Sequence, residues 1–133
     1  MEQTERINAK AAITKYWLPL ILYCVAIFIQ SSFPSPDIEL DRFSFDKILH
    51  FLAYAGLGIL FYRAYGTLRI QKNQIVLITL SILSAALYGA GDELHQSFVA
   101  GRHADAFDLL ADIAGSFCGV LVFRHLTSKA SHR

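Results

Sequence analysis

The sequence predicts an all-α membrane protein in which four transmembrane helices pack as a bundle. The chain has 133 residues, 54% of them hydrophobic, and its mean hydropathy is +0.40. The apolar residues form four blocks of 15 to 18 residues, at 16–33, 48–62, 75–91 and 106–123. Interfacial flanks extend each block toward the roughly 20 residues that a helix needs to cross a hydrocarbon core. No block alternates with a period of two, which argues against a transmembrane barrel.

The basic residues predict the orientation of these helices. Nine of the twelve Lys and Arg residues precede the first block, lie between the second and third blocks, or follow the fourth. The positive-inside rule therefore places both termini in the cytoplasm. The chain divides into a cytoplasmic lead (1–15), a four-helix membrane domain (16–126) and a short cytoplasmic tail (127–133). We expect a multi-pass protein of the cytoplasmic (inner) membrane.

The acidic residues have the opposite distribution. Of the eleven Asp and Glu residues, all except Glu2 and Glu5 belong to the outer loops or to the outer halves of the helices. The polar chemistry of the chain is therefore expected on the extracytoplasmic side of the membrane.

Acidic residues inside the fourth block indicate a face that is turned away from lipid. An ionised side chain at the bilayer centre costs about 2.5–3.5 kcal/mol on insertion scales. Steps of three and four residues place five residues on one helix face: Asp105, Asp108, Asp112, Gly115 and Gly119. The two glycines form a G-x-x-x-G pattern, which allows another helix to approach closely. We therefore predict that this face lies inside the bundle and that Gly115 and Gly119 serve helix packing.

The other blocks carry polar residues at the same predicted depth. The second block has Asp46, His50 and Tyr54 on one face, with Lys47 beside it. The third block ends in acidic and amide residues, and Arg102 follows in the loop. Together these positions predict an outward-facing polar pocket, whose residues are Asp46, Lys47, His50, Tyr54, Asp92, Glu93, Gln96, Arg102, Asp108 and Asp112.

Two interpretations of this pocket stay open. Lys47 and Arg102 could pair with neighbouring acids in an ionic latch that holds the helices together. However, the outer side has nine acids and three bases, which is more acid than mutual pairing needs. Protonation, water, a metal or a cationic part of a ligand could satisfy the surplus. Arg102, as an exposed loop guanidinium, could bind a carboxylate or phosphate with two hydrogen bonds.

Other classes of function receive little support. The sequence has no Gly-rich phosphate loop and no Cys/His zinc pattern, and no spacing demands a metal, so neither a cofactor nor a metal is predicted. The basic residues are too sparse to favour nucleic-acid binding. Cys24 and Cys118 lie in apolar blocks and are expected to pack as small apolar side chains.

Two spaced motifs resemble those of the VanZ-like family of small membrane proteins. DKILHFLAY (46–54) resembles its D-K-x-x-H-x-x-x-Y element. DELHQSFVAGRHADAFDLLADIAGSFCG (92–119) resembles its second element, and QSSFP resembles the S-S-x-P turn that is common in the family. The chain departs from the pattern at Ala100, where many members have Pro, and at Asp112, where Asn is frequent. The resemblance implies the same motif positions as the pocket above. It also implies a link to teicoplanin resistance, with which the family's namesake is associated.

Three functions are consistent with these features. The first is a membrane module that binds a lipid-linked or phosphate-bearing ligand of the cell envelope, such as a cell-wall precursor, and affects glycopeptide susceptibility. We favour it over catalysis because no covalent nucleophile is recognised.

The second is a metal-assisted hydrolase or transferase that uses His50, Asp92, Glu93 and Asp108. The third is a structural or accessory protein whose charges only stabilise the bundle. In that case the G-x-x-x-G face could instead serve homo-oligomerisation.

Overall fold

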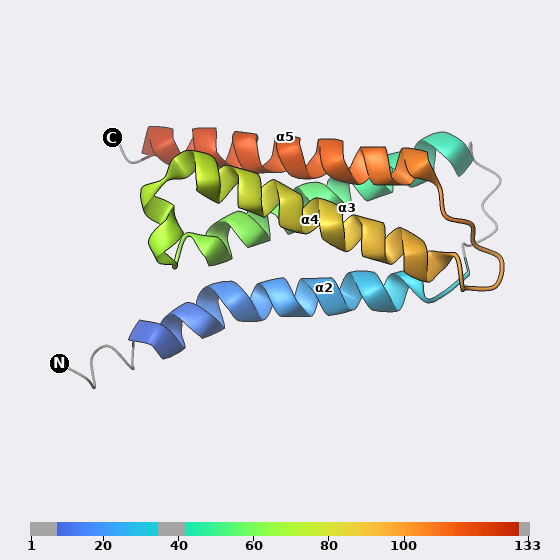
Figure 1. Ribbon diagram of the computed structural model, residues 1–133, viewed down its shortest axis with the longest axis horizontal. Coiled ribbons are helices and arrows are strands. Elements are labelled where there is room, and N and C mark those ends of the chain that lie inside the picture. The colour runs from blue at the N-terminus through green and yellow to red at the C-terminus, as the bar shows by residue number, and fades with distance from the viewer. Residues whose placement is uncertain (1–7, 35–41, 131–133) are drawn as a thin grey trace.

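The described part of the chain is a bundle of long helices. The computed structural model describes residues 8–34 and 42–130, with only the backbone of residues 42–44. Within these ranges the main helices are α2 (Leu18–Ser31), α3 (Arg42–Tyr65), α4 (Gln74–Gln96) and α5 (Ala106–Ala130), as Figure 1 shows. A π-helical turn, η1 (Ile13–Trp17), leads into α2, and a 3-10 turn, η2 (Arg69–Lys72), connects α3 to α4.

Four of the described helical segments are long and apolar enough to cross a membrane. They are Asn8–Ser31, Phe45–Tyr65, Gln74–Gln96 and Ala106–Ala130, each of 21 to 25 residues. The prediction of an all-α chain with four transmembrane helices is therefore confirmed. The start of the first described helix and the C-terminal end of α5 lie at one end of the bundle, and the α4–α5 loop lies at the other (Figure 1).

Three local features set the helix ends. Pro19 has no N–H to donate to the preceding turn, and that turn is the π-helical η1. Asn73 begins α4, where its Oδ1 accepts hydrogen bonds from the N–H groups of Ile75 and Val76. α4 continues past the predicted apolar block to Gln96, because its last polar side chains are buried in the bundle instead of facing water.

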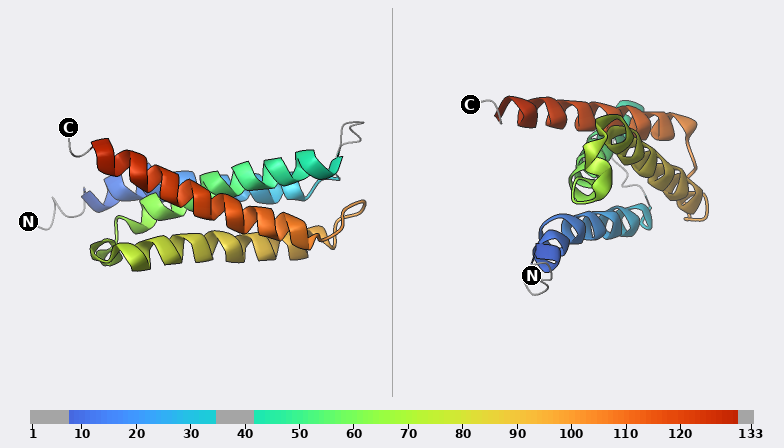
Figure 2. Two further views of the ribbon diagram at one scale, coloured as in Figure 1. Left: turned by 90° about the horizontal axis from the view of Figure 1, so that it is seen from above. Right: turned by 60° about the vertical axis from the view of Figure 1, so that its left-hand side comes forward.

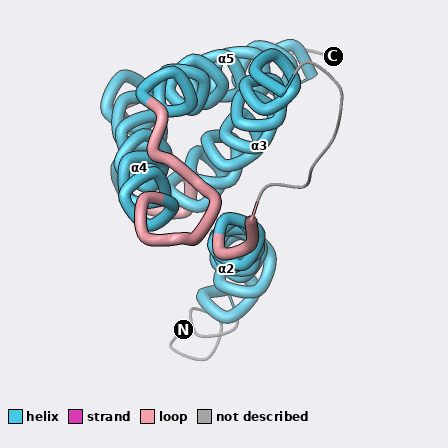
Figure 3. The backbone as a smooth tube through the Cα atoms, turned by 90° about the vertical axis from the view of Figure 1, so that its right-hand side faces the viewer, coloured by secondary structure: helices cyan, strands magenta, loops and turns pink. Residues whose placement is uncertain are grey.

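α3, α4 and α5 pack directly on one another. Figure 2 shows α5 running across α3 and α4, and Figure 3 shows these three helices grouped, with α2 alongside. The glycines of α5 make the closest approach. Gly115 meets the backbone of Phe51, and Gly119 meets the backbone of Ala55, so α3 occupies the G-x-x-x-G face. This placement leaves no room for a second copy of the chain at that face.

α2 packs on the bundle through apolar side chains around the buried Leu20 and through polar contacts along its length. The Tyr23 hydroxyl donates to the carbonyl oxygen of Ala53 (2.9 Å), and the Tyr88 hydroxyl donates to that of Cys24 (2.6 Å). Near the α4–α5 loop, Ser32 Oγ lies 3.0 Å from His95 Nε2, and the Phe28 ring stacks on the His95 ring. Large apolar side chains cover the outer faces of all four helices, as expected for contact with lipid.

Candidate functional site

The predicted polar residues gather at the end of the bundle that carries the α4–α5 loop. Figure 3 looks onto this end and shows the loop crossing from α4 past α2 to α5. Asp46 and Lys47 are half-buried there. The other predicted pocket residues are buried: His50, Tyr54, Asp92, Glu93, Gln96, Arg102, Asp108 and Asp112. The structure thus brings together side chains from α3, α4, α5 and the loop.

A charged network joins α3 to α5. Lys47 Nζ donates to Asp105 Oδ2 at 2.6 Å and also contacts Asp108 Oδ1. His50 Nδ1 lies 2.9 Å from Asp112 Oδ1, and His50 Nε2 lies 3.8 Å from Asp108 Oδ2. Two bases of α3 are therefore paired with three acids that lie in α5 or just before it.

Asp105 lies just before α5 and not within it. Its Oδ1 accepts a hydrogen bond from the Phe107 N–H (2.8 Å), so the side chain caps the helix. The hydrogen bond from Lys47 holds the pKa of the Asp105 carboxyl below its ordinary value. Asp105 therefore has two structural roles, as a helix cap and as a partner of Lys47.

Arg102 folds back onto the bundle end. Its Nη2 donates to Gln96 Oε1 at 2.7 Å, and its Nη1 lies 3.4 Å from the carbonyl oxygen of Phe33. Gln96 Nε2 in turn donates to Asp92 Oδ2 (2.9 Å). The side chain of Arg102 is only 9% exposed, so the expectation of an exposed guanidinium is wrong. The cause is the turn at Gly101, whose φ of +78° favours glycine and redirects the chain over α4.

Glu93 connects α4 to the start of α5. Its Oε2 accepts a hydrogen bond from the backbone N–H of Asp105 (2.8 Å). Its other oxygen, Oε1, is buried and has no hydrogen-bond partner among the described residues. The same is true of Asp112 Oδ2 and of the Tyr54 hydroxyl. Three buried oxygen atoms at this end of the bundle therefore have unsatisfied hydrogen-bonding capacity.

Gly89 lies where Asp112 and Tyr54 meet. A methyl group at Gly89 would lie 2.7 Å from Asp112 Oδ2 and 3.1 Å from Tyr54 Cε1. Gly89 is not among the residues predicted from the sequence. Its spacing from the predicted site residues could have identified it. Gly89 precedes Asp92 by three residues and Gln96 by seven, so it lies on the same helix face as both.

Two sets of side chains have the proximity that a metal ion needs. His50, Glu93 and Asp112 form one set, and Asp46, His50 and Asp108 form the other. In each set, one ligand atom from every residue lies within 4.8 Å of the others. The two sets share His50, so they describe two neighbouring positions for a cation.

Comparison with known proteins agrees with this architecture. The VanZ/LLP1 family profile matches residues 4–127, which is nearly the whole chain. An uncharacterized protein of Schizosaccharomyces pombe is 29% identical over 77 residues, which cover 58% of this chain and 45% of the relative. The matched segment thus spans less than half of the relative's length, and no solved structure matches the chain. The resemblance found in the two motifs is confirmed, and this chain, a multi-pass membrane protein by its four apolar helices, belongs to the VanZ/LLP1 family.

Proposed function

We propose that this protein binds the phosphate-bearing head group of a cell-envelope lipid at the loop end of its bundle. The proposal rests on the burial of Arg102 and on the neutral hydrogen-bond acceptors around it. Its guanidinium is buried, yet its described hydrogen-bond acceptors are neutral: the Gln96 amide oxygen and the Phe33 carbonyl oxygen. Within the described residues, no carboxylate lies within ion-pair distance of it.

A buried guanidinium that has no anionic partner among the described residues favours an anionic ligand. Removing a charge from water is costly unless an opposite charge or strong hydrogen bonds compensate. The planar fork of Arg has five N–H donors, which match the oxygen atoms of phosphate. The two described contacts leave donors for such a ligand.

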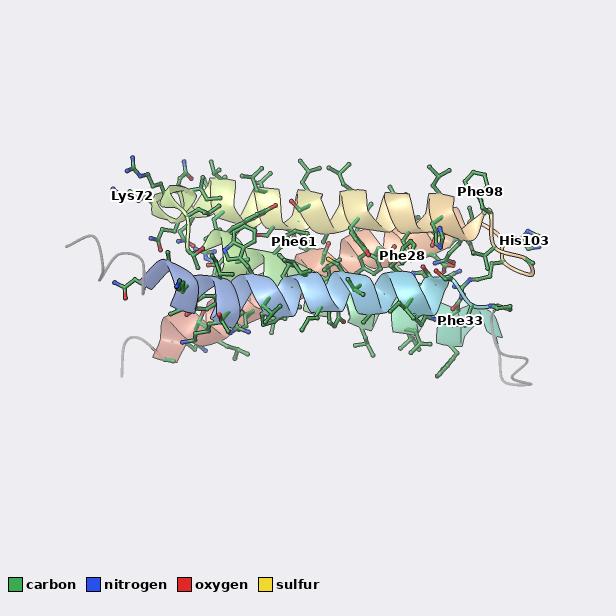
Figure 4. All side chains as sticks on the ribbon, turned by 90° about the horizontal axis from the view of Figure 1, so that it is seen from below. Phe28, Phe33, Phe61, Lys72, Phe98 and His103 are labelled. Carbon is green, nitrogen blue, oxygen red and sulfur yellow. The ribbon has the colours of Figure 1, made fainter. Side chains whose placement is uncertain are left out.

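The surroundings of Arg102 favour a lipid over a free phosphate. Phe33, Phe98 and Phe107 are exposed near the loop, and Figure 4 shows Phe33 and Phe98 at this end with His103. Apolar side chains next to a polar site allow a lipid to keep its chains in the bilayer while its head group binds. In a cell with a wall, binding of such a lipid would be the means by which the protein alters teicoplanin susceptibility. The family resemblance implies an effect of this kind.

The proposal requires the loop end to face away from the cytoplasm. The unequal distribution of Lys and Arg supports this orientation. With Cys24 and Cys118 replaced by Ala, we expect His103→Cys to react with a membrane-impermeant maleimide in intact cells. Lys72→Cys, at the opposite end, should react only after the membrane is permeabilised. The reverse pattern would contradict the orientation.

Binding can be measured with a long-chain isoprenyl phosphate in nanodiscs of phosphatidylcholine. We expect Arg102→Gln to weaken binding at least about tenfold, since a hydrogen bond to a charged group contributes about 1.5–3 kcal/mol. Lys72→Gln removes the same charge at the opposite end and should bind like the wild type. The matching isoprenol, which lacks phosphate, should bind weakly to all three proteins. Equal binding of the alcohol, or unchanged binding by Arg102→Gln, would contradict the proposal.

One observation supports a second candidate, an accessory protein whose charges stabilise the bundle. Lys47 bridges Asp105 and Asp108, and this pairing has the arrangement expected of an ionic latch between α3 and α5. In that case a partner protein carries the activity, and Arg102→Gln should leave lipid binding unchanged. The nanodisc experiment therefore separates the two candidates.

A further inference from the structure

We infer that the chain also binds a divalent transition-metal cation, Mn²⁺ or Zn²⁺, between His50, Glu93 and Asp112. The inference goes beyond the lipid proposal and does not depend on it, because it concerns different side chains and a different ligand. The cation would lie inside the bundle, between α3, α4 and α5.

The three residues come from three different helices and meet at one point. His50 is on α3, Glu93 on α4 and Asp112 on α5. One ligand atom from each lies within 4.8 Å of the other two. Bonds of about 2.0–2.2 Å to zinc hold ligand atoms roughly 3–4 Å apart, so small side-chain movements complete the set. A cation here would join α3, α4 and α5.

The hydrogen bonds of the two carboxylates supply an independent observation. Each uses one oxygen on a protein partner: Glu93 Oε2 accepts from the Asp105 N–H, and Asp112 Oδ1 lies 2.9 Å from His50 Nδ1. Each leaves its other oxygen buried without a described partner. Glu93 and Asp112 are 6% and 0% exposed, so bulk water does not satisfy these atoms. The contact of Asp112 lies within the set, whereas Glu93 is anchored through one oxygen by a group outside it, as metal ligands usually are, and its other oxygen is open.

Tyr54, whose ring borders Gly89 together with Asp112, adds a third unsatisfied oxygen atom. The side chain is 1% exposed, and its hydroxyl has no hydrogen-bond partner among the described residues. Its ring and Asp112 Oδ2 both border Gly89, and the ring lies parallel to that of His50, with centroids 6.3 Å apart. The absence of a side chain at Gly89 keeps this space open between the two oxygen-bearing groups.

The donor set selects the class of cation. An imidazole nitrogen together with carboxylate oxygens suits Zn²⁺ or Mn²⁺, whereas Ca²⁺ and Mg²⁺ prefer sites made wholly of oxygen. The alternative set of Asp46, His50 and Asp108 is less favourable. Asp46 is half-buried, and the Lys47 ammonium already contacts Asp108, so a cation would have to displace another positive charge.

The test is cation binding by the purified full chain in mild detergent, after chelator treatment and without added lipid. Mn²⁺ is added alone and followed by electron paramagnetic resonance, and Zn²⁺ is counted by elemental analysis. We expect about one ion for each chain in the wild type. Glu93→Gln and Asp112→Asn should bind at least about tenfold more weakly, and Tyr54→Phe should also bind more weakly.

Three controls make the test decisive. Lys72→Gln changes a charge at the opposite end of the bundle, away from the set, and should bind like the wild type. Asp46→Asn distinguishes the two sets, since a loss confined to this variant would overturn the placement at Glu93 and Asp112. Helical circular dichroism confirms that each variant is folded. No bound ion in the wild type, or equal binding by folded Glu93→Gln and Asp112→Asn, would overturn the inference whatever the result with isoprenyl phosphate.

Discussion

Gly115→Ala is expected to destabilise the bundle more than any other single methyl addition. The new methyl group would overlap the carbonyl oxygen of Phe51 and lie 2.9 Å from the carbonyl carbon. These are backbone atoms, so α3 and α5 must separate. Overpacking destabilises a protein by about 1–3 kcal/mol. We expect the upper end of this range, because backbone atoms cannot move aside as a flexible side chain can. The measurement is thermal unfolding in detergent, followed by helical circular dichroism.

Gly91→Ala is the matched control for this substitution. Gly91 is also in a long helix, but a methyl group there would have no atom within 4 Å. Alanine favours helix over glycine by about 1 kcal/mol, so Gly91→Ala should be neutral or stabilising. A Gly115→Ala protein as stable as the wild type would contradict the close α3–α5 contact.

Lys47→Met is expected to have the second largest effect on stability. The change leaves Asp108, whose side chain is 5% exposed, without its ammonium partner. Removing one partner of a buried ion pair lowers the free energy of unfolding by about 3–5 kcal/mol. Because the Lys47 side chain is 19% exposed, we expect roughly 2 kcal/mol here. Thermal unfolding again gives the measurement, with Lys72→Met as the control at the opposite end.

The double variant Lys47→Met, Asp108→Asn should recover part of this loss, because no uncompensated carboxylate stays buried. The double-mutant cycle then isolates the coupling between the two side chains. A cycle that shows no coupling would mean that the Lys47–Asp108 contact contributes nothing to stability, and it would remove the support for an ionic latch.

The free energy of unfolding, measured as the pH falls below 5, tests the same network of Lys47 and its acidic partners. Lys47 lowers the pKa of Asp105 below its ordinary value of 3.8. A lowered carboxyl pKa adds stability at neutral pH, and this stability is lost as the pH falls below about 4 and through the folded-state value. In Lys47→Met this contribution is absent, so that protein should lose less stability than the wild type between pH 5 and the acid extreme.

The helices and the site face could be predicted from the sequence because both depend on local spacing. The spacing of Asp108, Asp112 and Gly115 was enough to place them inside the bundle. Their partners could not be predicted, because several acids lie within reach of Lys47 and only the packed geometry selects Asp105 and Asp108. The burial of Arg102 depends on the positive φ of Gly101, and spacing gives no information about how a loop folds back.

The two proposed ligands would occupy neighbouring parts of one polar end. Arg102 lies against Gln96 and the carbonyl of Phe33, while the cation set lies deeper, between α3, α4 and α5. Glu93 belongs to the cation set, and it also holds the Asp105 backbone where the loop enters α5. A cation would offset part of the buried negative charge close to the proposed anion site.

Native mass spectrometry of the protein extracted from its own membrane shows whether Arg102 holds a phosphate-bearing lipid. The samples are the wild type, Arg102→Gln and Lys72→Gln, each checked for helical content. We expect that a phosphate-bearing lipid stays bound to the wild type and to Lys72→Gln and is absent from Arg102→Gln. A wild type that carries no such lipid, or the same lipid on all three proteins, would contradict it.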